Sequence, residues 1–343
     1  MTRRGVALTP METRREVMVR AALLADDLGY EVFALPEGWG LDSTPVLAEI
    51  ALATRQIRLV SGVLSVWGRT PATLAMTAAT LAEMSGGRYV LGLGASTRAL
   101  AEGFHDVPFA GAADRLAGTV TAVRALLAGE PARVQHVPGA RPLRLGLPPA
   151  PEVPIWVAAL GPRTLRVATE LADGWFPAML ARDSLPGSVA RMRRRPVTVA
   201  AGPLAVAGDD PRAARDIAAN CIAWYVCAMG DVYARSLTEQ GYGAEVQAIR
   251  AANPRPSPRG GVVPDEAQAV LGQLAATGTA EQVRAQLDRW DDLADIVVIG
   301  LPPGLPWTAI EATLRAAAPE LPADRGTAPQ TTALPATVAS RAS

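Results

Sequence analysis

Short apolar runs alternate with longer amphipathic segments along most of the chain. Short apolar runs are typical of strands that are buried on both faces, and segments with a period of 3.6 are typical of helices that cover a sheet. The alternation therefore predicts repeated βα units and a parallel sheet.

Eight segments have the character of strands, and most of them are followed by a helical pattern. The expected strands are 4–8, 31–35, 57–63, 88–94, 153–160, 174–179, 196–207 and 294–302. The expected helices are 12–30, 44–55, 70–87, 113–130, 162–173, 210–242 and 306–317. Thr44-Pro45 and Thr70-Pro71 have the residue types that cap and open helices.

Eight parallel strands predict an α/β fold made of a single (β/α)8 TIM barrel. The long segment 210–242 would form a helical insertion between strands seven and eight. A doubly wound sheet is the alternative, which periodicity alone leaves open. Residues 1–319 would form the barrel, and residues 320–343, rich in Pro, Thr, Ala and Ser, are predicted to be a disordered tail.

Charge and composition exclude several classes of function. The 343 residues carry 33 basic and 33 acidic side chains, which gives no electrostatic reason to expect nucleic acid or an anionic membrane as a partner. All the basic residues are arginine, so a lysine Schiff base is excluded. An anionic ligand would have to bind arginine or backbone N–H groups.

Few residues of the chain are suited to metal or disulfide chemistry. Cys221 and Cys227 are six positions apart in an expected helix, and His105 and His136 are the two histidines. We expect neither a disulfide nor a metal site. No apolar stretch is long enough to cross a membrane, and no signal peptide is recognisable, so a cytoplasmic location is expected.

The loops after the strands are where a barrel carries its active site. Ser61-Gly62-Val63 ends a strand with a glycine that would let a planar ligand approach, or that simply closes the strand. Glu37, with Trp39 nearby, could serve as an acid or base, or pair with an arginine. His105 could donate a proton, or be an ordinary hydrogen-bonding residue.

Three further segments have two readings each. The run "LGLGAST", 91–97, begins like a dinucleotide turn but has Thr97 at the position of the third glycine. The run "AALGPRT", 158–164, is an anion site at a helix N-terminus or an ordinary turn. The segment "IAWYVCAMGDVY", 222–233, is core packing or the lining of an apolar substrate cavity.

Several of these segments together resemble a known family. "TRQIRLVSGV" followed by "RTPATLAMTAATLAEMSGGRYVLGLGAS" is similar to the bacterial-luciferase-like flavin and deazaflavin oxidoreductases. "EGFHDVPF" and "PIWVAALGPRTLRVATELADGWFP" resemble the subgroup that uses coenzyme F-420, a deazaflavin. The resemblance covers about residues 5–315 and implies the same TIM barrel.

The resemblance also implies how the cofactor is held. Its tricyclic ring would lie against a bulge at Ser61, Gly62 and Val63, which contains a non-prolyl cis peptide bond in the family. Its phosphate and tail would contact the loops after strands four and five, at Ser96, Thr97, Ala159, Leu160, Gly161, Pro162 and Arg163. The run "LGLGAST" would then belong to the barrel mouth rather than to a dinucleotide turn.

The implied activity is hydride transfer between coenzyme F-420 and a C=C, C=N or C=O group of a medium-sized hydrophobic substrate in secondary metabolism. Glu37 or His105 would handle the proton, and the substrate would contact Trp39, Trp67, Tyr225 and Met229. An FMN-dependent monooxygenase with a separate reductase is the second reading, and a barrel without redox function is the third. Relatives commonly form homodimers, so a homodimer is expected.

The chain departs from the family pattern at a few positions. Ala95 stands where the sugar-phosphate dehydrogenase branch has a glutamate, which argues against that activity. Phe104 and Asp106, on either side of the histidine, and Gly118 also differ from close relatives. These differences indicate either a specialised substrate pocket or weakened cofactor binding.

Overall fold

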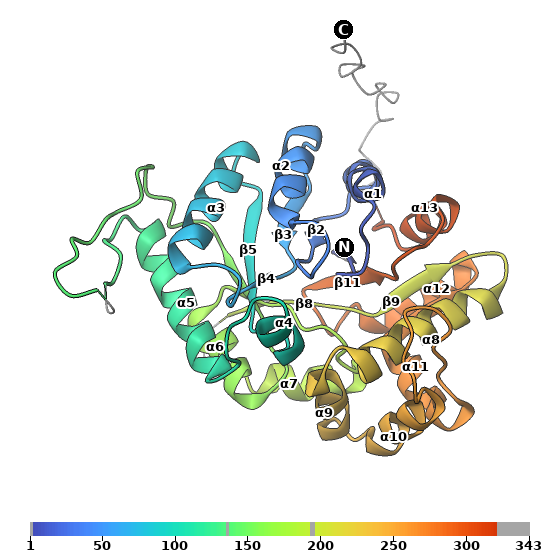
Figure 1. Ribbon diagram of the computed structural model, residues 1–343. Helices are drawn as coiled ribbons and strands as arrows, with labels where there is room; N and C mark the ends of the chain where they lie inside the picture. Colours follow the sequence, from blue (N-terminus) through green and yellow to red (C-terminus); the bar gives the residue numbers. More distant parts are fainter. Residues whose placement is uncertain (1–2, 135–136, 193–195, 321–343) are drawn as a thin grey trace, which may run out of the picture.

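Eight parallel strands close into a barrel in the computed structural model, which describes residues 3–134, 137–192 and 196–320 (Figure 1). The order is β1–β2–β3–β5–β6–β7–β8–β11, and β11 pairs with β1 to complete the ring. This closure confirms the predicted TIM barrel and excludes the doubly wound sheet. The predicted tail, apart from Glu320, and His136 lie outside the described residues.

The barrel strands are short and almost entirely buried, as parallel strands under a layer of helices must be. They are β1 Arg4–Leu8, β2 Val32–Leu35, β3 Arg58–Ser61, β5 Tyr89–Gly94, β6 Ile155–Ala158, β7 Gly174–Trp175, β8 Thr198–Ala201 and β11 Ile296–Leu301. Three further strands lie off this ring: β4 Leu64–Ser65, β9 Leu204–Ala207 and β10 Ala275–Gly278.

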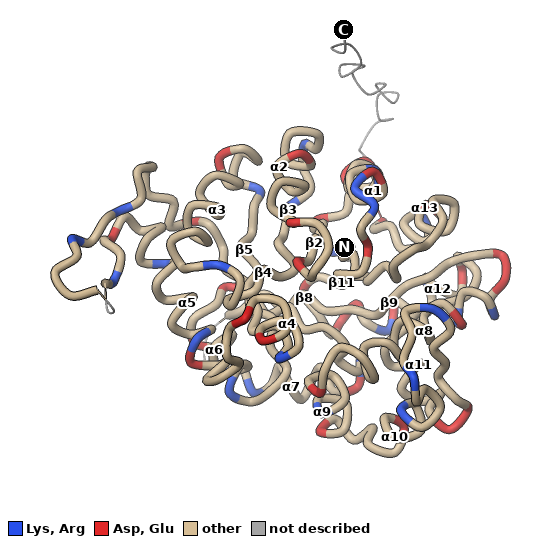
Figure 2. Tube along the Cα trace, viewed as in Figure 1, with Lys and Arg blue, Asp and Glu red and all other residues tan. Residues whose placement is uncertain are grey.

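Helices surround the barrel on its outer face (Figure 1). The first seven are α1 Arg15–Asp27, α2 Ser43–Ala53, α3 Pro71–Met84, α4 Arg98–Gly103, α5 Ala112–Leu127, α6 Pro162–Leu171 and α7 Leu185–Ala190. The others are α8 Pro211–Ala228, α9 Asp231–Glu239, α10 Gly243–Ala252, α11 Gln268–Leu274, α12 Ala280–Leu287 and α13 Trp307–Ala316. Acidic and basic residues are interspersed over these helices and their loops (Figure 2).

Local capping chemistry explains where two of the helices begin. Thr70 accepts a hydrogen bond from the backbone N–H of Thr73, and Pro71 is the first residue of α3, as the sequence predicts. Thr44 was the expected cap of α2, but this expectation is wrong. The carboxylate of Asp42 accepts from the N–H of Thr44 instead, and α2 therefore begins at Ser43.

The core has two parts, one inside the barrel and one between the barrel and the helices. The inner part consists of the inward side chains Val32, Ala34, Val60, Val90, Trp156, Ala200, Ile296 and Val298, with Phe176 packed against them. Phe176 and Val298 also line the cavity at the barrel mouth, so the inner core forms the floor of that cavity.

The segment between β8 and β11 differs from its prediction in three ways. The expected strand 196–207 is two strands separated at Gly202-Pro203, and β9 pairs with the unpredicted β10. The expected continuous helix 210–242 breaks after Ala228, and α8 and α9 meet at an angle of 103°. In the described part of the chain, no single helix has the length and apolar composition to cross a membrane; only this bent pair, taken together, passes that test.

Candidate functional site

A bulge connects β3 to β4 at the end of the barrel where the strands terminate. The peptide bond between Gly62 and Val63 is cis, at the position where the family resemblance places such a bond. Ser61 is fully buried, and its Oγ accepts hydrogen bonds from Gly92 N at 2.8 Å and from the Tyr89 hydroxyl at 3.0 Å. The same Oγ donates to the Gly92 carbonyl oxygen at 3.1 Å. Ser61 therefore holds the bulge against β5 and does not line the cavity.

Two glycines of β5 allow the bulge to lie this close. A Cβ added to Gly92 would overlap the carbonyl oxygen of Ser61, and one added to Gly94 would lie 2.5 Å from Cγ2 of Val63. Both positions therefore require glycine for packing. The glycines of "LGLGAST" are explained by this contact rather than by a dinucleotide-binding turn.

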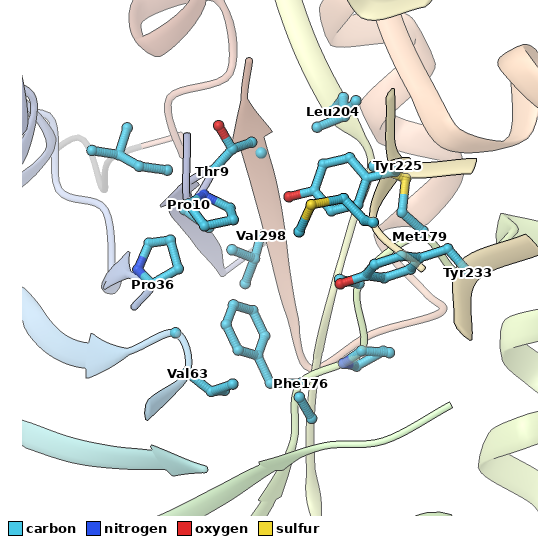
Figure 3. Close-up of a pocket in the computed structure, with 18 of the residues that line it drawn as sticks. Thr9, Pro10, Pro36, Val63, Phe176, Met179, Leu204, Tyr225, Tyr233 and Val298 are labelled. Carbon is cyan, nitrogen blue, oxygen red and sulfur yellow. The ribbon is translucent and has the colours of Figure 1, made fainter. Parts of the chain in front are cut away.

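A cavity of about 180 Å³ opens beside the bulge, at the carboxyl ends of the strands (Figure 3). This is the face on which TIM barrels carry their active sites. Seven of the residues predicted for the site line it: Glu37, Gly62, Val63, Ser96, Thr97, Tyr225 and Met229. The structure thus brings together residues from four separate segments of the chain.

Other lining residues were not singled out in the sequence. They include Thr9, Pro36, Phe176, Met179, Leu204 and Tyr233 (Figure 3). Thr9 directly follows the first strand, and this position could have identified it in the sequence as a residue of the barrel mouth. Tyr233 lies in the same aromatic segment as Tyr225, but only the bend between α8 and α9 brings it to the cavity.

Two of the lining residues have an unusual backbone conformation. Ser96 and Met179 have φ values of 54° and 55°, in the left-handed region that favours glycine. Such residues are concentrated at active sites and ligand-binding loops, because the surrounding structure must hold them there. Both follow barrel strands, β5 and β7, so this strain lies at the edge of the cavity.

Glu37 lines the cavity and has an arginine partner, which was one of its two predicted roles. Its Oε1 accepts from Arg69 Nε at 3.0 Å, and its Oε2 accepts from Ser65 N at 3.2 Å. Arg69 also contacts the Asp42 carboxylate at 2.7 Å. Burial acts to raise the pKa of Asp42, but hydrogen bonds from Thr44 and the charge of Arg69 outweigh it and lower that pKa.

His105 does not lie among the residues that line the cavity. Its ring lies over Gly68, where an added Cβ would be 2.6 Å from His105 Cε1. It also makes an edge-on contact with Phe104, at 5.1 Å between ring centroids. A proton-transfer role for His105 stays a prediction.

The two predicted tryptophans also lie outside the cavity lining. Trp67 is buried, and its indole N–H donates to the carbonyl oxygen of Ala95 at 2.6 Å. It therefore supports the loop after β5 from behind. Trp39 is 43% exposed, on the loop after β2.

The loop after β6 is separate from the lining as well. Ala159 is buried, and its carbonyl accepts from the Trp175 indole N–H at 2.8 Å. Arg163 makes a solvent-exposed ion pair with Asp114 at 3.0 Å. Gly161 precedes α6 without a side-chain cap, and Pro162 opens that helix. Contacts of Leu160 and these neighbours with a cofactor tail stay predictions.

The described part of the chain was also compared with the ligand sets that bind metal ions. There, no three His, Cys, Asp or Glu side chains are grouped so that they could hold a metal ion. The two cysteines are free thiols, and burial raises the pKa of Cys221 to about 12, which keeps it protonated.

Comparison with known proteins agrees with this geometry. The chain is 28% identical, over 302 residues, to a Mycobacterium tuberculosis protein named as a coenzyme F-420-dependent oxidoreductase; the match covers 78% of this chain and 85% of that protein. The fold is similar to coenzyme F-420-dependent tetrahydromethanopterin reductase from Methanopyrus kandleri, with a TM-score of 0.74, 20% identity and coverage of 92% and 98%.

The FMN-containing oxygenating component of 3,6-diketocamphane monooxygenase from Pseudomonas putida shares the fold as well. Its TM-score is 0.63 at 16% identity, with coverage of 94% of this chain and 100% of that one. Residues 1–295 match the luciferase-like monooxygenase family. The resemblance found in the sequence is therefore confirmed, and this chain belongs to the luciferase-like monooxygenase family of enzymes.

Proposed function

We propose that this enzyme is a coenzyme F-420-dependent oxidoreductase. It transfers a hydride to or from a C=C, C=N or C=O group of a medium-sized hydrophobic substrate, in a reaction of secondary metabolism. The observation that carries the proposal is the apolar cavity at the barrel mouth, one wall of which is the bulge at Gly62-Val63. The relative from Mycobacterium tuberculosis supports the choice of cofactor.

The residues present fit a planar deazaflavin ring. Gly62 has no side chain, and an added Cβ would lie 3.0 Å from Ala34 Cβ and 3.2 Å from a Phe176 ring carbon. Backbone rather than side chain therefore faces the cavity at this point, as close approach of a flat ring requires. When bound, the deazaflavin supplies the ring carbon that gives or takes the hydride.

The cofactor tail is assigned to the loops after β5 and β6. Ser96 and Thr97 line the cavity on one side of the bulge. The first turn of α6, which Gly161 and Pro162 precede and open, presents backbone N–H groups that suit an anionic group. Arg163 would have to leave its exposed pair with Asp114 to add its charge.

Glu37 is the residue assigned to the proton that accompanies hydride transfer. It faces the cavity, while Arg69 and the Ser65 N–H hold its two oxygens in place. A proton would be held at one of these carboxylate oxygens. His105 is the second candidate, and it would have to leave its position over Gly68 to reach the cavity.

Two other functions are alternatives, each with one observation in its favour. The fold similarity to an FMN-containing monooxygenase favours an FMN enzyme that a separate reductase supplies. The cavity volume of about 180 Å³ favours a barrel without redox function, because ligand pockets usually measure about 300–1,000 Å³. Cofactor titrations separate the three.

The decisive experiment titrates the purified protein with oxidised coenzyme F-420 and, in parallel, with FMN, and follows fluorescence quenching. We expect micromolar binding of coenzyme F-420 and much weaker binding of FMN. Gly62→Val should weaken the binding of coenzyme F-420, whereas Gly208→Val, where an added Cβ has no neighbour within 4 Å, should not. Tight FMN binding would assign the monooxygenase function, and binding of neither would remove the redox proposal.

A homodimer is part of the proposal. Leu52 on α2 and Met76 on α3 are 72% and 57% exposed, and these two helices are neighbours on the barrel surface (Figure 1). We assign these two side chains to the surface that a second copy of the chain covers, because contiguous exposed apolar surface marks interaction sites. Sedimentation analysis of the wild type and of a Leu52→Glu, Met76→Glu double variant tests this: a dimer should become a monomer.

A further inference from the structure

The wall of the cavity opposite the bulge carries two tyrosines from consecutive helices. Tyr225 is in the last two turns of α8, and Tyr233 is in the first turn of α9. Their rings meet edge to face with 4.9 Å between centroids, and both hydroxyl groups point into the cavity (Figure 3). The bend between the helices at Met229-Gly230 is what brings the two rings together.

These hydroxyls have no hydrogen-bond partner within the described part of the chain, although both phenols are largely removed from solvent; Tyr225 is only 5% exposed. Thr9, at the end of β1, lines the same cavity and is also 5% exposed. Its Oγ1 is buried without a partner. The hydroxyls of Tyr225 and Tyr233 open into the cavity, where a ligand can satisfy them directly, whereas Thr9 Oγ1 is closed off and reaches a ligand only if its side chain rotates. Polar groups removed from bulk water are nearly always hydrogen-bonded, so the unpaired Thr9 Oγ1 beside two unpaired tyrosine hydroxyls indicates a ligand.

The charges around the cavity determine what kind of ligand group suits these hydroxyls. None of the described residues that line the cavity is cationic, and its single carboxylate, Glu37, already has Arg69 as a partner. Burial raises the pKa of Tyr233 to about 12 and the pKa of Tyr225 well above its ordinary value. The phenols therefore stay protonated and donate hydrogen bonds without carrying charge.

We propose that Tyr225 and Tyr233, joined by Thr9 once its side chain has rotated toward the cavity, form a subsite that binds an uncharged oxygen of the substrate, a ketone or alcohol oxygen on an otherwise apolar skeleton. A carboxylate or phosphate does not suit it, because no positive charge is present to offset the desolvation of an anion. The apolar neighbours Met179, Leu204 and Met229 would contact the carbon skeleton.

This inference deepens the proposed function and rests on it for the role of the bound group. If the deazaflavin ring lies on the bulge after β3, the substrate lies between that ring and the two tyrosines. Its oxygen then points toward the tyrosine wall and away from the ring. The three hydroxyls would then choose which substrate carbon faces the ring. They act by orientation and by hydrogen bonds to the oxygen.

The test compares ligands that share one skeleton and differ only in the polar group. Binding of 2-tetralone, 2-tetralol, tetralin and tetralin-2-carboxylate to the full-length wild-type protein is measured by calorimetry and by saturation-transfer NMR. Two or three hydrogen bonds to neutral groups should make the ketone and the alcohol bind roughly tenfold or more tightly than tetralin. The carboxylate should bind no better than tetralin.

The variants Tyr225→Phe, Tyr233→Phe and Thr9→Val remove one hydroxyl each with little change of shape. Each should reduce the ratio of ketone to tetralin affinity several-fold and leave the affinity for tetralin unchanged. Tyr242→Phe is the matched control, because Tyr242 does not line the cavity. Thermal unfolding of each variant checks that it is folded, and the wild-type comparison does not depend on any variant.

The outcomes separate this inference from the proposed function. If coenzyme F-420 fails to bind but the ketone preference and its loss in the variants are observed, the proposed function is wrong and the subsite is correct. If the ketone binds no better than tetralin, or none of the four compounds binds, the subsite is wrong. If the tyrosine variants weaken binding of coenzyme F-420 rather than of the ketone, these hydroxyls hold the cofactor and the subsite is also wrong.

Discussion

The two walls of the cavity are built by different means. The bulge wall is backbone that is held by buried contacts, with Ser61 bonded to Gly92 and Val63 packed over Gly94. The opposite wall consists of side chains, Tyr225 and Tyr233, on helices that lie outside the ring of barrel strands. The first wall cannot change without disturbing the barrel, whereas the second can change one side chain at a time.

This difference indicates that the two walls bind different groups. A wall that admits little variation suits a group that is the same for every related enzyme, such as a cofactor ring. A wall of replaceable side chains suits a group that differs between enzymes, such as a substrate. The following predictions test whether the two walls can be perturbed separately.

The largest effect is expected for Gly92→Ala. The new methyl group would overlap the Ser61 carbonyl oxygen, and backbone of the bulge or of β5 would have to move. We expect the free energy of unfolding to fall by about 3 kcal/mol in urea titrations. The matched control is Gly118→Ala, an open position inside α5, which should gain about 0.5–1 kcal/mol. Equal effects at both positions would contradict the close packing.

Gly230→Ala perturbs the tyrosine wall and should have a smaller effect. Gly230 has φ 76° and ψ −170°, a combination that is essentially restricted to glycine, while an added Cβ would have no close contact. We expect the free energy of unfolding to fall by about 2 kcal/mol. Relative to wild type, the affinity for 2-tetralone should fall by more than the affinity for coenzyme F-420. Gly208→Ala, just before α8, is the control and should change neither quantity. An equal loss of both affinities would argue against separate walls.

Gly62→Ala perturbs the bulge wall without a severe overlap. The added Cβ would press on Ala34 and on the Phe176 ring, which predicts a loss of about 1 kcal/mol in unfolding free energy. Adding Phe176→Leu should recover part of this loss, because the two positions are in contact. Additive losses in this double-mutant cycle would show that the ring is not what the methyl group meets.

The smallest effect concerns the loop that carries Thr9. The buried carboxylate of Glu12 accepts hydrogen bonds from Arg14 and from Gly304 N, and thereby ties the loop after β1 to the loop after β11. Burial acts to raise the pKa of Glu12, but the hydrogen bonds from Arg14 and Gly304 outweigh it and lower the pKa below its ordinary value of 4.5.

A lowered folded-state pKa means that the ionised carboxylate stabilises the fold above the unfolded-state pKa. This stabilisation is lost as pH falls through the lower folded-state value. Urea titrations of the wild type should thus show constant stability above about pH 5 and a decline below it. Glu12→Gln should be less stable at pH 7 and show a shallower decline, whereas Glu49→Gln, in an exposed pair with Arg15, should match the wild-type profile.

The βα units were predictable because hydrophobic periodicity is a local property, and the family resemblance favoured the barrel over the doubly wound sheet. The first strand was expected at 4–8 and is Arg4–Leu8, and α3 begins at the expected proline, Pro71. Glu37 and Gly62 were singled out because they lie at the ends of expected strands, and Tyr225 because it lies in the aromatic segment 222–233. All three line the cavity. Here the signal lay in the residue itself and its nearest neighbours.

Other features could not be predicted because they depend on contacts between distant segments. The strand β10 has four residues without a strong apolar run, and its pairing with β9 stabilises it. The partner of Glu37 is 32 positions away, so the sequence could offer an arginine but could not name Arg69. In the sequence, Gly230 is a single glycine within a helical pattern. A helix can tolerate such a glycine, so the sequence did not indicate that the chain bends there.

The amino-acid sequence alone determined the alternation of strands and helices and the family that the chain resembles, and that resemblance in turn implied a barrel rather than a doubly wound sheet. These follow from short-range periodicity and from motifs that are continuous in the chain. Only the tertiary structure decided that Gly92 and Gly94 serve packing of the bulge and that Thr9, Tyr225 and Tyr233 share one cavity. Such groupings arise from closing the barrel and bending α8 against α9, and the distances they create between remote residues are not encoded in any local stretch.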